Sequence, residues 1–189
     1  MNVYDFDNTI YDGESAIDLF FMYFRSHPAL IKYVPTVLTL LRDYRKGVAR
    51  FDDFVERFGY IFNDYFTHHD VDFDKLVVKF WDKNEKKIKS WYKEIQKEDD
   101  LIITASPRFM MDEISKRIGV THYLATEFDT KTGNFQRGCF RERKIEFFRE
   151  SYPDAVIDDF YTDSMNDKFL FPYAKRVFFV KGNKITQIK

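Results

Sequence analysis

Hydrophobic and polar positions follow two different patterns along this chain. From residue 16 to about residue 97, apolar side chains recur at helical spacing, as at Ile17, Phe20 and Phe24. Beyond residue 97, short apolar runs alternate with amphipathic segments, and these runs cover residues 101–104, 122–126, 155–161 and 177–180. The first pattern predicts helices with no convincing strand among them. The second is typical of the β-α-β units of a parallel sheet.

One further strand is predicted near residue 1, where the helical region separates it from the other strands. The run Val3–Tyr4 favours an extended backbone, and Asn8 supplies a break soon after it. We therefore predict an α/β fold in which residues 1–11 and 98–189 form one core and residues 12–97 form a mostly helical insert. An insert that leaves the sheet just after its first strand is well placed to cover that end of the sheet.

Composition and charge narrow the function classes. The 189 residues fit one domain, or one domain with an inserted subdomain, and 19% aromatic residues predict a core filled largely by rings. A formal net charge of -1 argues against a general nucleic-acid footprint. A single cysteine, Cys139, excludes an intrachain disulfide and a thiolate zinc cluster and fits a reducing compartment.

No targeting or membrane-spanning segment is predicted. The chain begins almost at once with a strand that carries two acids, which does not fit a secretory signal. The most apolar run, residues 28–41, contains Lys32 and Pro35 and is too short to span a bilayer. The expected location is the cytoplasm.

Two carboxylates follow the first predicted strand. Asp5 and Asp7 lie two residues apart, so they would share a face if the strand stayed regular, and at its carboxyl end they would crowd together. Open α/β sheets bind their ligands at that end. A divalent cation or a proton on one acid would relieve the repulsion. The alternative is that both residues serve as helix caps or turn residues.

A second strand end carries two hydroxyl groups. Thr104 and Ser106 follow the run 101–103, and Pro107 then suits the first turn of a helix that Gly119 would end. A strand that leads into a helix amino terminus makes an anion site. We expect Thr104 to bond a phosphate oxygen and Ser106 to be the helix N-cap.

A third strand end carries a second pair of acids. Asp163 is predicted at the strand mouth and Asp167 one turn into the next helix, while Asp158 and Asp159 lie earlier and are assigned structural roles. The pattern does not match a calcium-binding loop. Lys144 opens another predicted helix, where a lone lysine is usually exposed and opposes the helix dipole.

Taken together, these positions resemble the haloacid dehalogenase (HAD) superfamily, subfamily IB, in its phosphoserine-phosphatase-like branch. The resemblance covers nearly the whole chain in the family's order. The matching features are Asp5-Phe6-Asp7-Asn8-Thr9 for the first motif, Thr104 for the second, Lys144 for the third, Asp163 with Asp167 for the fourth, and the predicted hairpin flap 128–137 with Thr132-Gly133-Asn134. It implies a HAD-like Rossmannoid core with a central parallel sheet and an inserted helical C1-type cap.

The resemblance also implies a reaction and a cofactor. Asp5 would attack the phosphorus of a phosphomonoester to form an aspartyl-phosphate, which water then hydrolyses. Mg²⁺ would be held by Asp5, the backbone carbonyl of Asp7 and Asp163. Thr104 and Lys144 would hold phosphoryl oxygens, Asp7 would act as acid and base, and Asp167 would support Lys144 or a metal-bound water.

The substrate is expected to be a small phosphorylated metabolite, with Glu14 and Ser106 at its binding site. Glu14 is similar in position to the glutamate with which phosphoserine phosphatases contact their substrate. Two departures argue against phosphoserine, because those enzymes carry Ser-Gly-Gly and Gly-Asp-Gly where this chain has Thr104-Ala105-Ser106 and Thr162-Asp163-Ser164. An aromatic insert, with residues such as Phe20 and Phe21, allows a larger or lipid-like phosphoester.

Two other classes of function remain open at this point. The same aspartyl-phosphate could be transferred to an acceptor other than water, or the fold could serve as a non-catalytic phosphate-binding module. A module of that kind would be expected to have lost Asp5, Lys144 or Asp163, and all three are present. The sequence leaves the oligomeric state and the physiological substrate undetermined.

Overall fold

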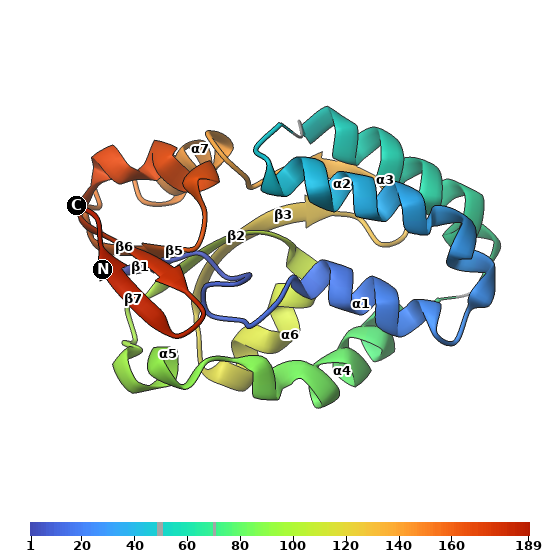
Figure 1. The fold of residues 1–189 in the computed structure, drawn as a ribbon, viewed down its shortest axis with the longest axis horizontal. Helices are drawn as coiled ribbons and strands as arrows, with labels where there is room; N and C mark the ends of the chain where they lie inside the picture. Colours follow the sequence, from blue (N-terminus) through green and yellow to red (C-terminus); the bar gives the residue numbers. More distant parts are fainter. Residues whose placement is uncertain (49–50, 70) are drawn as a thin grey trace.

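The computed structural model describes residues 1–48, 51–69 and 71–189. In this part of the chain one seven-stranded sheet forms, with the order β4-β3-β2-β1-β5-β6-β7 (Figure 1). The strands are β1 (Val3–Tyr4), β2 (Leu101–Pro107), β3 (His122–Phe128), β4 (Phe135–Arg137), β5 (Ile157–Thr162), β6 (Ala174–Lys181) and β7 (Lys184–Gln187). Strands β3, β2, β1, β5 and β6 pair in parallel, and the edge strands β4 and β7 are antiparallel to their neighbours. The predicted α/β class with a mostly parallel central sheet is confirmed.

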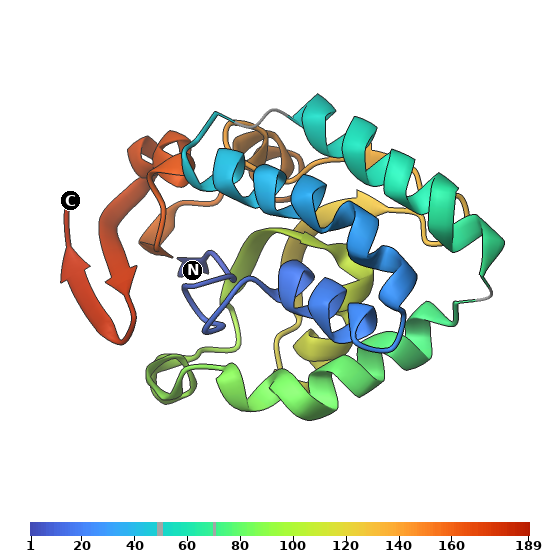
Figure 2. The same cartoon turned by 45° about the vertical axis from the view of Figure 1, so that its right-hand side comes forward.

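Five α-helices separate β1 from β2 along the described chain. They are α1 (Ser15–Phe24), α2 (Val34–Arg45), α3 (Phe51–Tyr65), α4 (Phe73–Asn84) and α5 (Ser90–Ile95), and the shorter 3-10 segments are Pro28–Tyr33, Phe66–His68 and Glu85–Lys87. Beyond β2 come α6 (Arg108–Ile118), α7 (Arg143–Ser151) and the 3-10 helix η4 (Met165–Tyr173). In Figures 1 and 2, α2 and α3 lie side by side, on the opposite side of the molecule from α4 and α6.

The helical insert divides between two hydrophobic clusters. Leu30, Tyr33 and Val37 pack with Ile61 and Tyr65 in a cluster that belongs to the insert alone. Side chains of α4 and α5 instead join the cluster that includes β1 and α6. The predicted division of the chain into residues 1–11 with 98–189, and 12–97, stays a prediction. Because α4 and α5 pack with the sheet, we expect limited proteolysis that removes the insert to leave these two helices with the core.

Several local predictions can be checked against the strands and helices. Gly119 ends α6 with φ +71°, in the left-handed region that glycine tolerates. The hairpin flap forms as β3 and β4, which pair antiparallel around the turn at Gly133. Asp158 binds Lys175 at 2.7 Å and Asp159 binds Arg176 at 2.6 Å, so both acids have structural partners. Strand β7 was not predicted, because its four residues, Lys184–Gln187, are mostly polar and exposed.

No helix in the described residues has both the length and the apolar character that a bilayer crossing needs.

Trp81 anchors α4 against the sheet. Its ring is fully buried and meets Phe6 and Tyr11 edge-on, and its Nε1 donates to the carbonyl of Met110 at 3.0 Å. Trp81→Ala is therefore expected to lower the free energy of unfolding by about 3–5 kcal/mol, measured by urea denaturation. Tyr60, with 62% of its surface exposed, is the control, because Tyr60→Ala should cost less than about 1 kcal/mol. Equal losses of unfolding free energy in the two variants would contradict the role of Trp81 as the residue that anchors α4.

Candidate active site

The carboxyl ends of three neighbouring strands meet at one cavity. Asp5 directly follows β1, Thr104 lies in β2, and Asp163 directly follows β5. Because β1 lies between β2 and β5 and all three run parallel, their side chains converge. The cavity has a volume of about 320 Å³ and is lined by Asp5, Asp7, Asn8, Glu14, Thr104, Ala105, Asp163, Ser164 and Asn166.

Lys144 joins two acids at the floor of this site. Its Nζ lies 2.8 Å from an oxygen of Asp5 and 2.8 Å from an oxygen of Asp167, and the lysine side chain is only 1% exposed. Thr162 donates a hydrogen bond to the other oxygen of Asp167 at 2.8 Å. A lysine at a helix start is usually exposed. Lys144 is buried instead, because the two carboxylates compensate its charge.

The Asp5 carboxyl is held in an environment that favours its protonated form. Burial raises the pKa of Asp5 to about 7, and Lys144 opposes that rise while Asp167 adds to it. Thr9 also donates to Asp5, at 3.4 Å. Lys144 thus favours the ionised form of this acid against the effect of burial, and an ionised Asp5 can act as a nucleophile or a metal ligand.

Asp7 is fixed by two serines from different elements. Ser106 donates to one oxygen at 2.5 Å, and the backbone amide of Ser15 donates to the other at 2.7 Å. The hydroxyls of Ser15 and Ser106 are themselves 2.9 Å apart. Burial and the nearby Glu14 raise the pKa of Asp7 to about 6, while the hydrogen bonds from Ser106 and Ser15 lower it. Asp7 is therefore suited to holding and releasing a proton.

The predicted N-cap role of Ser106 is wrong. Helix α6 begins at Arg108, Pro107 occupies the cap position, and no side chain caps the helix. Because β2 continues to Pro107, the hydroxyl of Ser106 is directed to Asp7 rather than to the helix amides. The amide of Ser106 donates to Thr104 Oγ1 at 3.0 Å, which fixes that hydroxyl at the strand end.

A tight loop turns the chain out of β1 and places Asp7. The amides of Ile10 and Tyr11 both donate to the carbonyl of Phe6, at 2.8 and 2.9 Å. Asn8 adopts a left-handed backbone with φ +56°, which asparagine tolerates better than most residues. Its side chain donates to Glu14 at 2.8 Å, and Lys89 Nζ donates to its carbonyl oxygen. These bonds hold Glu14 at the edge of the cavity.

The oxygens at this site suit a hard divalent cation. Burial first, and then the charges of Asp5 and Asp167, raise the pKa of Asp163 to about 8. Like-charge crowding of that kind is relieved when a cation binds. In the described residues no group of three or more His, Cys, Asp or Glu side chains is arranged to hold a metal ion. The predicted set needs only two, Asp5 and Asp163, because its third ligand is the carbonyl of Asp7, and oxygen ligands fit Mg²⁺.

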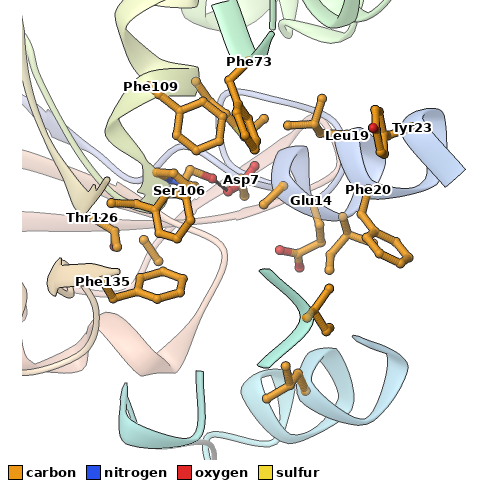
Figure 3. Close-up of a pocket in the computed structure, with 18 of the residues that line it drawn as sticks. Asp7, Glu14, Leu19, Phe20, Tyr23, Phe73, Ser106, Phe109, Thr126 and Phe135 are labelled. Atoms are coloured by element: carbon orange, nitrogen blue, oxygen red, sulfur yellow. Dashed lines mark hydrogen bonds between the residues drawn. The ribbon is translucent and has the colours of Figure 1, made fainter. Parts of the chain in front are cut away.

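A second pocket, of about 210 Å³, opens beside the first. Asp7, Glu14 and Ala105 line both pockets, so the two adjoin at these residues. Figure 3 shows Asp7 and Ser106 near the middle of this pocket, with the rings of Phe73, Phe109 and Phe135 around them and Leu19 and Phe20 from α1 opposite. Its lining residues come from the loop after β1, from the insert, from β2 and α6, and from the β3–β4 flap and the segment that follows it.

The structure brings every predicted site residue to these two adjoining pockets or to the residues beneath them, and it adds three. Thr9, Ser15 and Lys89 were not given roles from the sequence, yet Thr9 bonds to Asp5, Ser15 to Asp7, and Lys89 to the carbonyl of Asn8 next to Asp7. A signal for Ser15 existed, since a serine at the start of a predicted helix is expected to present its amide and hydroxyl together. The sequence does not predict a role for Lys89 at the site, because this lysine lies in a strongly charged segment and its burial comes from tertiary packing.

Comparison with known proteins supports the same fold. A family model described as haloacid dehalogenase-like hydrolase matches residues 3–170. A solved structure of a protein of unknown function from Bordetella pertussis Tohama I has a TM-score of 0.71 and 18% identity, and the match covers 94% of this chain and 87% of that chain. No curated protein matches the sequence.

Two structures with functional descriptions are also similar. A phosphoserine phosphohydrolase-like protein from Francisella tularensis subsp. tularensis SCHU S4 has a TM-score of 0.62 and 15% identity, over 94% of this chain and 86% of that one. The phosphoserine phosphatase from T. onnurineus has a TM-score of 0.59 and 19% identity, over 94% of this chain and 81% of that one. At these identities the matches show a shared fold.

Proposed function

Since this chain belongs to the haloacid dehalogenase-like hydrolase family, we propose that it is a Mg²⁺-dependent phosphatase that hydrolyses a phosphomonoester through an aspartyl-phosphate. The observation that carries the proposal is the buried contact of Lys144 with Asp5 and Asp167 at the mouth of β1. A buried carboxylate whose ionised form is stabilised by a lysine, beside a second acid with a raised pKa, is the arrangement that nucleophilic phosphoryl transfer needs. A non-catalytic module has no such need.

In the first step an Asp5 oxygen bonds to phosphorus and the bond from phosphorus to the alcohol oxygen breaks. Asp7, held by Ser15 and Ser106 and protonated at the start, gives its proton to the leaving oxygen. In the second step a water oxygen bonds to phosphorus, Asp7 takes the water proton, and the bond from Asp5 to phosphorus breaks. Phosphate and the alcohol leave, and both acids return to their starting forms.

Positive charge and hydrogen-bond donors are required where the phosphoryl group sits. Lys144 is the cation that the described residues place against Asp5, and the Thr104 hydroxyl lines the same cavity. Mg²⁺ bound by Asp5, Asp163 and the Asp7 carbonyl would screen the repulsion between the nucleophile and a phosphate dianion and orient the group. Family members generally use Mg²⁺, and the oxygen-only ligand set is consistent with it.

The decisive experiment is phosphate release from a broad panel of phosphomonoesters, with Mg²⁺ or with EDTA. We expect release from some members that EDTA abolishes and added Mg²⁺ restores. Phosphoserine belongs in the panel, because several structures of this fold are phosphoserine phosphatases. Supplying alcohols as acceptors in the same assay separates hydrolysis from transfer, since transfer would form a new phosphomonoester in place of free phosphate. No release from any member would contradict the proposal.

Asp7→Asn separates proton transfer from metal binding. The variant keeps the backbone carbonyl that is proposed as a ligand, but an amide can neither give nor take the proton. Turnover should fall by roughly 10²–10⁴-fold, while the Mg²⁺ concentration that gives half-maximal activity should stay near its wild-type value. Asp163→Asn is the comparison, because it removes a proposed ligand and should raise that concentration sharply. An equal loss of Mg²⁺ affinity in both variants would assign the Asp7 side chain to the metal.

A further inference from the structure

The pocket beside Asp7 is built from aromatic rings that belong to three parts of the fold. Successive ring contacts join Tyr23, Phe66, Phe73, Phe109, Phe128 and Phe135, with centroid separations of 4.8–5.9 Å. The arc therefore runs from α1 and the insert, across α4 and α6, to the flap. The Phe73 and Phe109 rings meet edge-on and the other four ring pairs are tilted, so the rings hold one another in place and the pocket walls are set before a ligand arrives.

Charge is nearly absent from this pocket. Among its described lining residues the only charged side chains are Asp7 and Glu14, and both are acids; none is Lys, Arg or His. The carboxylate of phosphoserine would enter without a cationic partner and beside two acids, which is costly in an apolar site. Glu14 could pair with an ammonium group but would repel the carboxylate on the same carbon. Binding of a substrate whose alcohol part is an amino acid is therefore unfavourable in this pocket.

The position of Asp7 sets the direction in which a substrate must lie. It lines both the polar cavity and the apolar pocket, and it is the residue proposed to protonate the leaving oxygen. That oxygen is the atom at which the phosphoryl group joins the rest of the substrate. With phosphorus at Asp5, the alcohol part must extend past Asp7 into the apolar pocket.

Resting on the proposed phosphatase function, we propose that the substrate is the phosphomonoester of an alcohol with a hydrocarbon chain, and that the aromatic pocket binds that chain. Each methylene that enters an apolar site gains about 0.8 kcal/mol, or about fourfold in affinity. The predicted signature is a rise in kcat/KM of about that factor per methylene until the pocket is filled. Soluble amphiphiles and membrane lipids share this chemistry.

The test uses a series of n-alkyl phosphates from ethyl to octyl, with phosphoserine alongside and Mg²⁺ present. We expect kcat/KM to climb through the series and octyl phosphate to exceed phosphoserine. Vesicles that contain a phosphatidic acid, compared with free octyl phosphate, then show whether the preferred chain comes from a membrane or from solution. Phosphate release that does not depend on chain length, or that is fastest with phosphoserine, would overturn this inference and leave the phosphatase proposal intact.

A matched pair of variants on α2 tests whether the dependence of kcat/KM on chain length arises in this pocket. Leu41 lines the pocket, whereas Leu38 on the same helix is 48% exposed and does not line it. Leu41→Glu should collapse the ratio of octyl to ethyl kcat/KM by at least about tenfold, because it puts a charge where the chain lies. Leu38→Glu should keep the wild-type ratio. Equal ratios in the two variants would place the chain elsewhere and overturn the inference.

Binding of alkyl phosphonates, which cannot be hydrolysed, separates the two proposals. Calorimetry on the wild-type protein should show octyl phosphonate binding more tightly than ethyl phosphonate, with the difference lost in Leu41→Glu. That result without hydrolysis of any ester would overturn the phosphatase function while supporting the pocket as a chain-binding site. Neither hydrolysis nor chain-dependent binding would overturn both.

Discussion

Asp5→Asn is expected to lower kcat by at least about 10⁴-fold while leaving the fold intact. The amide has the size of the carboxylate but cannot form the bond to phosphorus, so no aspartyl-phosphate can accumulate. Its oxygen can still accept from Lys144, which donates to Asp5 at 2.8 Å in the wild-type protein. Loss of one of several crowded negative charges also removes repulsion, so the melting temperature should be unchanged or higher.

Stopped-time phosphate release and an acid quench for labelled phosphoenzyme measure the two consequences of Asp5→Asn separately. Asp12→Asn is the matched control, because it makes the same chemical change on an exposed residue of the same loop and should leave kcat within about twofold. A variant that still turns over within tenfold of the wild type would show that another group attacks phosphorus. A variant that melts far below the wild type would point to a structural role for Asp5.

The strand ends could be predicted from the sequence because their pattern is local. A short apolar run followed by a polar break marks the end of a parallel strand wherever the strand lies in the sheet. Asp5, Thr104 and Asp163 therefore appeared as three separate strand-end positions. Their convergence follows from parallel pairing of the strands that carry them, β1, β2 and β5, and the structure shows that pairing.

Side-chain direction and packing could not be predicted in the same way. A serine before a proline is equally compatible with a helix cap and with a strand residue. Ser106 bonds to Asp7 because β2 continues to Pro107, which the sequence does not specify. The packing of α4 with the sheet likewise depends on tertiary contacts of Trp81, which a helical stripe does not specify. Lys144 looks like a surface residue until its two acids, Asp5 and Asp167, are placed around it.

Lys144→Met is expected to lower kcat by at least roughly 10³-fold, because it removes the cation that faces both the nucleophile and the phosphoryl oxygens. Methionine fills much of the same space without the charge. Asp5 and Asp167 are then buried with no cation, so the pKa of Asp5 should rise above its present value of about 7 and leave less of the nucleophile ionised. Breaking a buried pair in this way should also lower the free energy of unfolding by about 3–5 kcal/mol at neutral pH in metal-free buffer.

The pH dependence of that destabilisation has a definite sign. An acid whose pKa is higher in the folded state than in the unfolded chain binds its proton more tightly when folded, so its contribution is favourable at low pH and is lost as the pH rises through the folded pKa. The free energy of unfolding of Lys144→Met should therefore be closest to the wild-type value near pH 4. The difference between the two proteins should grow as the pH rises through 7 and above. Lys168→Met, an exposed lysine next to Asp167, is the control and should change neither kcat nor this profile. Urea titrations at several pH values measure the effect, and a deficit that shrinks toward alkaline pH would show that Lys144 does not hold these carboxylates in their charged form.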